Sequence, residues 1–249
     1  MNERAHWNRI GTDYDDEIFD VFRSDRKKIL SKYLRKHANP KHRAVDFGCG
    51  TGKAFSLLSP AFKSVTGFDI SDELLKVASK RPFKNIRLNQ ADLTRNDLHF
   101  EPADFLFCCN VIMLPHPEMN RVMLGNVNKA LKPGGHALIV LPSLESMFYT
   151  GWRLIEWYRR EGTALKDIPA EDLSYFSASR SQMVDGIIHI DKVATKHYTE
   201  PELRVLISEA GLTALAIDRI EYEWTTEFEE PPEWMKEPYP WDWLIECQK

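Results

Sequence analysis

The chain is predicted to adopt an α/β fold: a seven-stranded, mostly parallel sheet with an antiparallel last strand, helices on both faces and a segment inserted after the fifth strand. Three observations predict it. Apolar runs alternate with helix-like segments across Val45 to Ser143, the pattern of successive βαβ units. The run Ala103 to Val111 is apolar throughout, as expected for a strand buried on both faces. With 249 residues, 43% of them hydrophobic, the chain can build one large core.

The first predicted strand ends in the sequence VDFGCGTG, Val45 to Gly52. Three glycines at alternate positions, Gly48, Gly50 and Gly52, follow the acid Asp46. Glycine adopts the positive φ that a tight turn requires, and its missing Cβ allows a ligand to approach the backbone. The segment therefore predicts a strand, a turn and a helix start against which a nucleotide-like ligand lies.

The position of the third glycine separates two kinds of nucleotide cofactor. A dinucleotide fingerprint, G-x-G-x-x-G, needs glycine where this chain has Lys53. A carboxylate at Asp46 would also repel a pyrophosphate, whereas it favours a ligand with positive charge. The pattern D-x-G-x-G-x-G resembles motif I of the class I S-adenosylmethionine-dependent methyltransferases, whose cofactor carries a sulfonium and an amino group. A glycine-rich turn with no ligand is the alternative.

Acids also end the next two predicted strands. Asp69 closes the run Ser64 to Ser71, and a carboxylate there can accept two hydrogen bonds from a ribose diol. Asp92 closes the run Asn85 to Leu93. The resemblance implies that Ile70 packs on adenine, that Asp92 accepts from the adenine amino group, and that the Leu93 amide meets a ring nitrogen. A solvated loop aspartate remains the alternative for Asp69.

Two later features complete the resemblance. The fourth strand ends at Asn110, at the sheet edge where ligands bind in open α/β folds. The sequence LKPGG from Leu131, followed by an apolar run to Ser143, is a familiar feature of the same superfamily. The resemblance implies a Rossmann-like fold, S-adenosyl-L-methionine as cofactor, and a segment before the N-terminal helix that folds over it. The cofactor contacts it implies are Tyr14, Asp46, Gly48, Cys49, Gly50, Asp69, Ile70, Ala91, Asp92, Leu93 and Asn110.

The remaining elements follow from periodicity and capping residues. Ser71 is a predicted N-cap, and Thr199 with Glu202 forms a predicted capping box. The expected helices are Glu17 to His37, Lys53 to Leu58, Asp72 to Lys80, Glu118 to Lys132 and Tyr198 to Leu212. The expected last strands are Thr213 to Ile220 and, antiparallel to it, Trp243 to Cys247.

One domain over residues 1–249 is the economical description, with an N-terminal helical cap at 1–40 and an inserted lid at 144–196. The lid is aromatic. One predicted helical stripe consists of Leu144, Met147, Phe148, Trp152, Ile155 and Tyr158. Packing of this stripe toward the core is the favoured interpretation, and the wall of a substrate pocket is the other.

Composition excludes several classes of function. The formal net charge of −4 gives no broad nucleic-acid footprint. The start lacks a secretory apolar region and the longest apolar strand is too short to span a bilayer, so a cytoplasmic protein without membrane contact is expected. The cysteines form no C-x-x-C pair, so neither a disulfide framework nor a metal site is expected.

The predicted function is methyl transfer from S-adenosylmethionine to a small-molecule substrate. Candidate proton acceptors are His116, just after the fourth strand, and His189, in the insertion, because histidine titrates near neutral pH. An exposed loop histidine is the alternative for His116. Three other functions stay open: a protein or tRNA methyltransferase, a non-catalytic cofactor-binding subunit and, less favoured, a dinucleotide enzyme. The sequence fixes neither the acceptor atom nor the oligomeric state.

Overall fold

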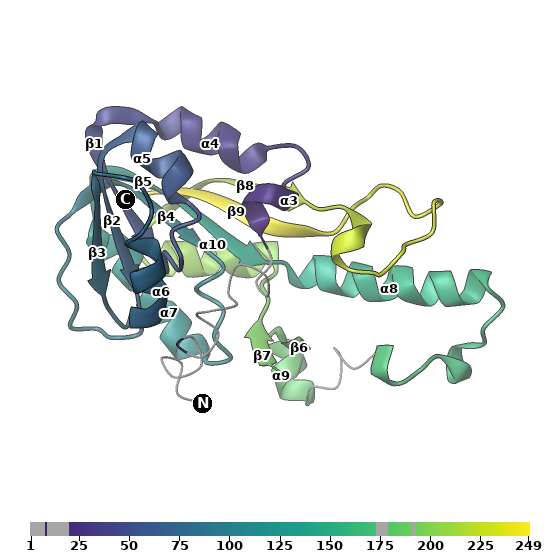
Figure 1. Ribbon diagram of the computed structural model, residues 1–249. Helices are drawn as coiled ribbons and strands as arrows, with labels where there is room; N and C mark the ends of the chain where they lie inside the picture. Colours follow the sequence, from purple (N-terminus) through teal and green to yellow (C-terminus); the bar gives the residue numbers. More distant parts are fainter. Residues whose placement is uncertain (1–7, 9–19, 173–178, 191–192) are drawn as a thin grey trace.

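A computed structural model describes residue 8 and residues 20–172, 179–190 and 193–249. The strands of its main sheet are β1 (Asn39–Phe47), β2 (Phe62–Asp69), β3 (Ile86–Gln90), β4 (Ala103–Cys109), β5 (Leu131–Pro142), β8 (Thr213–Glu221) and β9 (Trp241–Gln248). They are ordered β3-β2-β1-β4-β5-β9-β8 (Figure 1). A separate two-stranded sheet consists of β6 (Ile187–Ile190) and β7 (Val193–Lys196).

The helices cover both faces of the main sheet (Figure 1). The helices of the described residues are α3 (Val21–Ser24), α4 (Ile29–His37), α5 (Phe55–Ala61), α6 (Asp72–Ala78), α7 (Pro117–Ala130), α8 (Leu144–Arg160), α9 (Arg180–Val184) and α10 (Glu200–Glu209), with 3-10 turns η1 (Leu165–Asp167) and η3 (Trp224–Thr226); of these, α8 extends beyond the sheet and α9 lies beside β6. Leu34 of α4 and Leu58 of α5 pack on one face. Val127 of α7 and Ile207 of α10 pack on the other.

The strand directions confirm the predicted sheet. β1 through β5 pair in parallel, whereas β9 is antiparallel to both β5 and β8. The chain runs outward from β1 through β2 to β3, then returns to place β4 on the other side of β1. The carboxyl ends of β1 and β4 therefore flank the switch point, where open α/β sheets bind ligands.

The prediction of one continuous helix from Glu17 to His37 is wrong for those of its residues that the structure describes. Residues 17–19 lie outside the described residues, and the rest forms two helices, α3 and α4, separated at residues 25–28. Asp25 turns inward there, and its Oδ2 accepts the Leu30 N–H at 2.8 Å. Lys28 takes a left-handed φ of 51°. This local side-chain hydrogen bond competes with a continuous helix.

The aromatic stripe of α8 does not pack toward the core as favoured. Leu144 is buried, but Phe148 is 44% exposed and Trp152 51% exposed. The helix continues beyond the sheet, accompanied by the segment 222–240 (Figure 1). The Tyr149 ring lies 5.7 Å from that of Trp224 in this segment. Beyond the sheet edge, α8 packs against this segment and against η1 instead of against the sheet.

Capping residues predicted two helix starts correctly, whereas other element boundaries differ from the prediction. Ser71 Oγ accepts the Leu74 N–H, and Thr199 and Glu202 form the predicted capping box. The helix after the glycine turn begins at Phe55 and not at Lys53, β3 is shorter than predicted, and β9 begins two residues before Trp243. Among the described residues, no helix combines the length and apolar character needed to cross a membrane.

Candidate cofactor site at the carboxyl edge of the sheet

The glycine turn after β1 requires its glycines. Gly48 has a φ of +66°, and a Cβ there would lie 2.1 Å from Cγ2 of Val111. Gly52 has a φ of +80°, and its Cβ would lie 2.5 Å from the Phe55 ring. The Cys49 N–H donates to the Phe68 carbonyl of β2 at 3.0 Å. The turn is thus held against β2 with its backbone bare, as the sequence predicts.

Asp69 ends β2 with its carboxylate oriented by the backbone. Its Oδ2 accepts the Gly50 N–H at 2.8 Å and its Oδ1 accepts the Ser71 N–H at 2.9 Å. Burial raises the pKa of this carboxyl, and the backbone hydrogen bonds partly oppose that rise. Each carboxylate oxygen has a second lone pair, so the group can still accept from a diol.

Asp46 lies inside the sheet edge, 2% exposed. Its Oδ2 has no hydrogen-bond partner among the described residues. Burial, and then repulsion from Asp69, raise the pKa of Asp46 well above the ordinary aspartate value. A buried carboxylate without a cation is costly, and a positively charged ligand would offset that cost.

The segment after β3 is positioned beside Asp69. The Ala91 N–H donates to the Asp69 carbonyl at 2.9 Å. Asp92 Oδ1 accepts from both the amide and the hydroxyl of Thr94, at 3.0 and 2.6 Å. Leu93 is buried. Gln90 Nε2 also donates to the end of β2, to the carbonyl of Ile70 at 3.0 Å. The structure thus brings the predicted adenine-binding residues together next to the predicted ribose acid.

Asn110 follows β4 in an uncommon conformation. Its φ is +53°, and its N–H donates to the Val140 carbonyl at 3.0 Å. Its Oδ1 is buried without a hydrogen-bond partner among the described residues. The left-handed backbone carries strain of the kind found at ligand sites. The other predicted contact on this side, Tyr14, lies outside the described residues.

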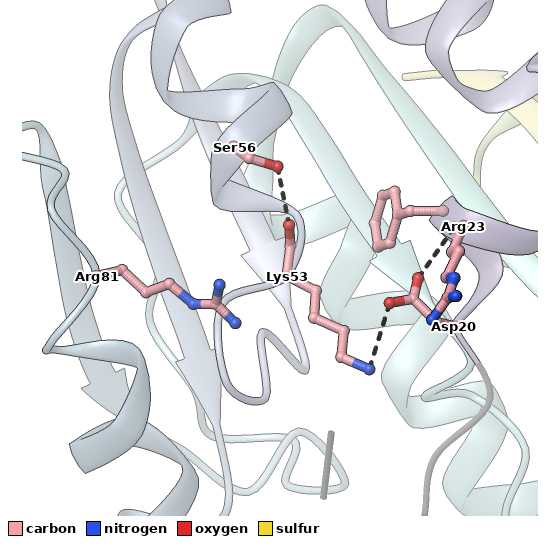
Figure 2. Close-up of a pocket in the computed structure, with 6 residues that line it drawn as sticks. Asp20, Arg23, Lys53, Ser56 and Arg81 are labelled. Atoms are coloured by element: carbon pink, nitrogen blue, oxygen red, sulfur yellow. Dashed lines mark hydrogen bonds and ion pairs between the residues drawn. The ribbon is translucent and has the colours of Figure 1, made fainter. Parts of the chain in front are cut away.

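A hollow of about 460 Å³ lies beside the glycine turn, between α3, α5 and the end of α6. Figure 2 shows its lining side chains. Lys53 Nζ lies 3.5 Å from Asp20 Oδ2, and Arg81 Nε donates to the Thr51 carbonyl at 2.9 Å. These contacts fasten the N-terminal segment and the end of α6 to the turn.

Sequence reasoning missed an acid and a phenol at the same edge. Asp242, the second residue of β9, accepts the Tyr222 hydroxyl on Oδ2 at 2.7 Å. Burial raises the pKa of Asp242 to about 7, with hydrogen bonds from Tyr222 and Asn110 opposing the rise and Glu227 adding to it. The predicted strand began at Trp243, which left Asp242 in a loop. The sequence Trp241-Asp242-Trp243, with an acid between two large apolar residues, was the signal that could have identified Asp242.

The predicted proton acceptors take different positions. His116 is exposed as the N-cap residue of α7, with no side-chain capping bond. His189 is half-buried in β6, and its Nδ1 is buried without a partner among the described residues. Both remain predictions.

The described residues bring together one group with metal-ligand atoms, at the opposite edge of the sheet. Ligand atoms of His37, His136 and Glu246 lie within 4.8 Å of one another. Lys36 Nζ, however, lies 2.8 and 2.7 Å from the two Glu246 oxygens. The side chain of Glu246 is therefore already paired with a cation from the chain itself.

The sequence resembles known methyltransferases. Residues 44–135 match the methyltransferase domain family. The chain is 32% identical over 143 residues to a demethylmenaquinone methyltransferase of Tropheryma whipplei, covering 55% of this chain and 57% of that protein. It is 33% identical over 113 residues to a tRNA N(3)-cytidine methyltransferase of Mus musculus, covering 42% and 40%. The matches thus span about half the length of these relatives.

Solved structures extend the likeness to the whole fold. One is a Burkholderia thailandensis 1,6-didemethyltoxoflavin-N1-methyltransferase with its substrate and S-adenosylhomocysteine. It has a TM-score of 0.60 and 15% sequence identity, covering 99% of this chain and 87% of that one. At that identity the likeness concerns the fold alone. The family match begins at β1 and includes the glycine turn, Asp69 and Asp92, the residues that form the site described above.

Proposed function

We propose that this chain, which belongs to the class I S-adenosylmethionine-dependent methyltransferase superfamily, transfers a methyl group from S-adenosyl-L-methionine to a small-molecule acceptor. The observation that carries the proposal is Asp46, a buried carboxylate beside a bare glycine turn with no cation among the described residues. The carboxylate of Asp69, at the end of the neighbouring strand, is oriented by hydrogen bonds from two backbone amides.

These residues fit the cofactor chemically. Asp69 would accept the ribose diol, Asp92 the adenine amino group, and Asp46 would face the positively charged methionine end. The orphaned Oδ1 of Asn110 would take a donor from the same ligand. When bound, the cofactor supplies an activated methyl group on a sulfonium, so the chain's tasks are alignment, exclusion of water and placement of the acceptor.

A small molecule is a better acceptor than a nucleic acid on charge grounds. The edge that holds the cofactor residues also carries the acids Asp46 and Asp242, which have no ion-pair partner among the described residues, whereas Asp20 there is paired with Lys53. Nucleic-acid binding relies on contacts from Lys and Arg to phosphates. A cluster of carboxylates would repel those phosphates. The exposed rings Phe148 and Trp152 of α8 offer apolar surface for a small acceptor.

His116 and His189 are the proposed acceptors of a substrate proton. His116 lies at the carboxyl edge, seven residues beyond the end of β4, and its exposed ring is accessible to solvent and substrate. His189 would act only if the β6–β7 hairpin approaches the acceptor. Replacement of a true general base lowers the rate by about a hundredfold or more.

Calorimetry with S-adenosylhomocysteine and with NAD tests the cofactor assignment. We expect binding of S-adenosylhomocysteine and none of NAD, because Lys53 stands where the dinucleotide turn needs glycine and the Asp46 carboxylate would repel a pyrophosphate. Tight binding of NAD without S-adenosylhomocysteine would overturn the proposal.

Labelled S-adenosylmethionine then tests the acceptor. The full chain is incubated with a metabolite extract filtered free of macromolecules and, separately, with total tRNA. We expect the label in the filtered extract. Label in tRNA alone would move the protein to the nucleic-acid group, and cofactor binding without transfer to either would favour a non-catalytic subunit.

A further inference from the structure

Asp242 lies on the acceptor side of the proposed cofactor site. Along the sheet the strands run β2, β1, β4, β5, β9. The cofactor acids Asp69 and Asp46 lie on β2 and β1, whereas Asp242 lies on β9, paired with Pro142 at the end of β5. A ligand whose ribose is held at β2 and whose methionine end lies at β1 and β4 therefore points its far end toward Asp242.

The carboxylate of Asp242 is held by its neighbours. Tyr222, 3% exposed, donates its hydroxyl to Oδ2 at 2.7 Å. Burial and the Asp242 charge raise the pKa of Tyr222 well above the ordinary tyrosine value, so the phenol keeps its proton. Asn110 donates a further hydrogen bond to the Asp242 side chain from the end of β4. Fixed in this way, the carboxylate keeps free lone pairs for another donor.

The groups facing Asp242 are acids and neutral donors. Cys109 on β4 feels, besides burial, the charges of Asp242, Asp46 and Asp20, which raise the pKa of its thiol. Glu227, after η3, is a further acid whose charge reaches Asp242. Within residues 20–172, 179–190 and 193–249, no Lys, Arg or His lies within ion-pair distance of Asp242. This arrangement favours a cation and repels an anionic acceptor.

From this geometry we infer that Asp242 binds the acceptor as an amine and takes its proton during methyl transfer, with Tyr222 as the residue that positions the carboxylate. The inference rests on the proposed function. It assigns the substrate class as amines with at least one N–H, and for this class it places the proton acceptor at Asp242 instead of at His116 or His189.

The atoms and charges of the step balance. The acceptor enters as an ammonium ion paired with ionised Asp242, and its N–H bond breaks as the proton passes to a carboxylate oxygen. The freed nitrogen lone pair forms the N–CH₃ bond while the C–S bond breaks and sulfur keeps that electron pair. Asp242 returns its proton to solvent when the product leaves. A carboxyl whose pKa is about 7 can accept and release a proton near neutral pH.

A binding experiment tests this without turnover. Calorimetry on the full chain saturated with S-adenosylhomocysteine uses ethanolamine, benzylamine and phenethylamine, with ethylene glycol, benzyl alcohol and phenethyl alcohol as matched neutral compounds. We expect at least one amine to bind more than tenfold tighter than its alcohol, and Asp242→Asn to remove that preference. Asp218→Asn, which alters an exposed tyrosine–aspartate pair elsewhere, is the control and should leave it unchanged.

A rate experiment tests the role of Asp242. For the amine that binds, labelled transfer should fall about a hundredfold in Asp242→Asn and less than threefold in the control Asp218→Asn. Tyr222→Phe removes a hydrogen bond that lowers the pKa of Asp242, so the acid limb of its pH–rate profile should move to higher pH. A purely structural tyrosine would leave that profile in place.

The contrary outcomes are distinct. Failure of the wild-type chain to bind S-adenosylhomocysteine would overturn the proposed function itself. Cofactor binding with no amine preferred over its alcohol, with label in alcohols only, or with transfer retained in Asp242→Asn would overturn this inference alone.

Discussion

The two edges of the main sheet treat buried acids in opposite ways. At the amino edge, Glu246 is buried, but Lys36 and His37 bond to its oxygens at 2.7 to 2.8 Å, and they hold its pKa below the ordinary glutamate value against the effect of burial. At the carboxyl edge, Asp46 and Asp242 are raised in pKa by burial and have no cation among the described residues. One edge balances its charge within the chain, and the other leaves charge for a ligand.

That difference separates an acid that stabilises the fold from acids that bind a ligand. A protein tolerates an uncompensated buried carboxylate only where another requirement outweighs its cost. Changes at the carboxyl edge should therefore alter ligand affinity more than stability, and changes at the amino edge should do the reverse.

The largest effect is expected from Asp69→Ala. Loss of both acceptors for the ribose diol should weaken S-adenosylhomocysteine binding about a hundredfold, since hydrogen bonds to charged groups contribute about 1.5–3 kcal/mol each. Because Asp69 also accepts from Gly50 and Ser71, the free energy of unfolding should fall by about 1–2 kcal/mol as well. Calorimetry and thermal unfolding measure the two effects. Unchanged affinity would show that the ribose does not bind here.

The amino edge provides the opposite test. Glu246→Gln keeps the shape of the side chain but weakens its charge-assisted bonds to Lys36 and His37, so the free energy of unfolding should fall by about 1–2 kcal/mol. Cofactor affinity should not change. Because the folded pKa of Glu246 is lowered, its stabilising effect is present above the unfolded pKa and is lost as the pH falls through the folded value. Wild-type stability together with weakened cofactor binding in Glu246→Gln would contradict the contrast drawn between the two edges of the sheet.

A smaller effect is expected from pH. The folded pKa values of Asp46 and Asp69 are raised, so these acids favour the ligand-free fold at low pH and oppose it as the pH rises through those values. A bound cationic cofactor offsets the free-energy cost of ionising these acids. Its affinity should rise with pH as the acids ionise, and titration calorimetry at a series of pH values would measure this rise.

Two controls bear on the same measurement. Adenosine, which carries no charge, should show little of this rise, and Asp46→Asn should flatten it for S-adenosylmethionine. Equal pH dependence for adenosine and for the full cofactor would mean that Asp46 does not meet a positive charge.

The residues proposed to bind the cofactor could be predicted from the sequence because they lie at or next to the ends of strands. Asp46 and Asp69 each close an apolar run, and parallel strands bring such ends to one edge of the sheet. The glycines at 48, 50 and 52 carry their own conformational signature, and all three adopt positive φ. Local sequence thus specified where these residues lie, and their contacts to the cofactor stay a prediction.

The acceptor side of the proposed site, which contains Asp242, could not be predicted from the sequence in the same way. Asp242 reaches this edge only because β9 inserts antiparallel between β5 and β8, which places it beside the end of β5. The break between α3 and α4 likewise depends on the burial of Asp25, and the exposure of Phe148 on where α8 leaves the sheet. Periodicity reports that a face is apolar but not what covers it.

The sequence by itself determined the order of strands and helices, the glycine turn and the acids at the ends of β1, β2 and β3. These features depend on backbone conformation and on neighbours within a few residues. Only the tertiary structure decided which acids are paired and which are left for a ligand: Glu246 meets Lys36 across two elements, whereas Asp46 and Asp242 meet no cation among the described residues. Charge compensation is a property of distance in space, and residues far apart in the chain determine it.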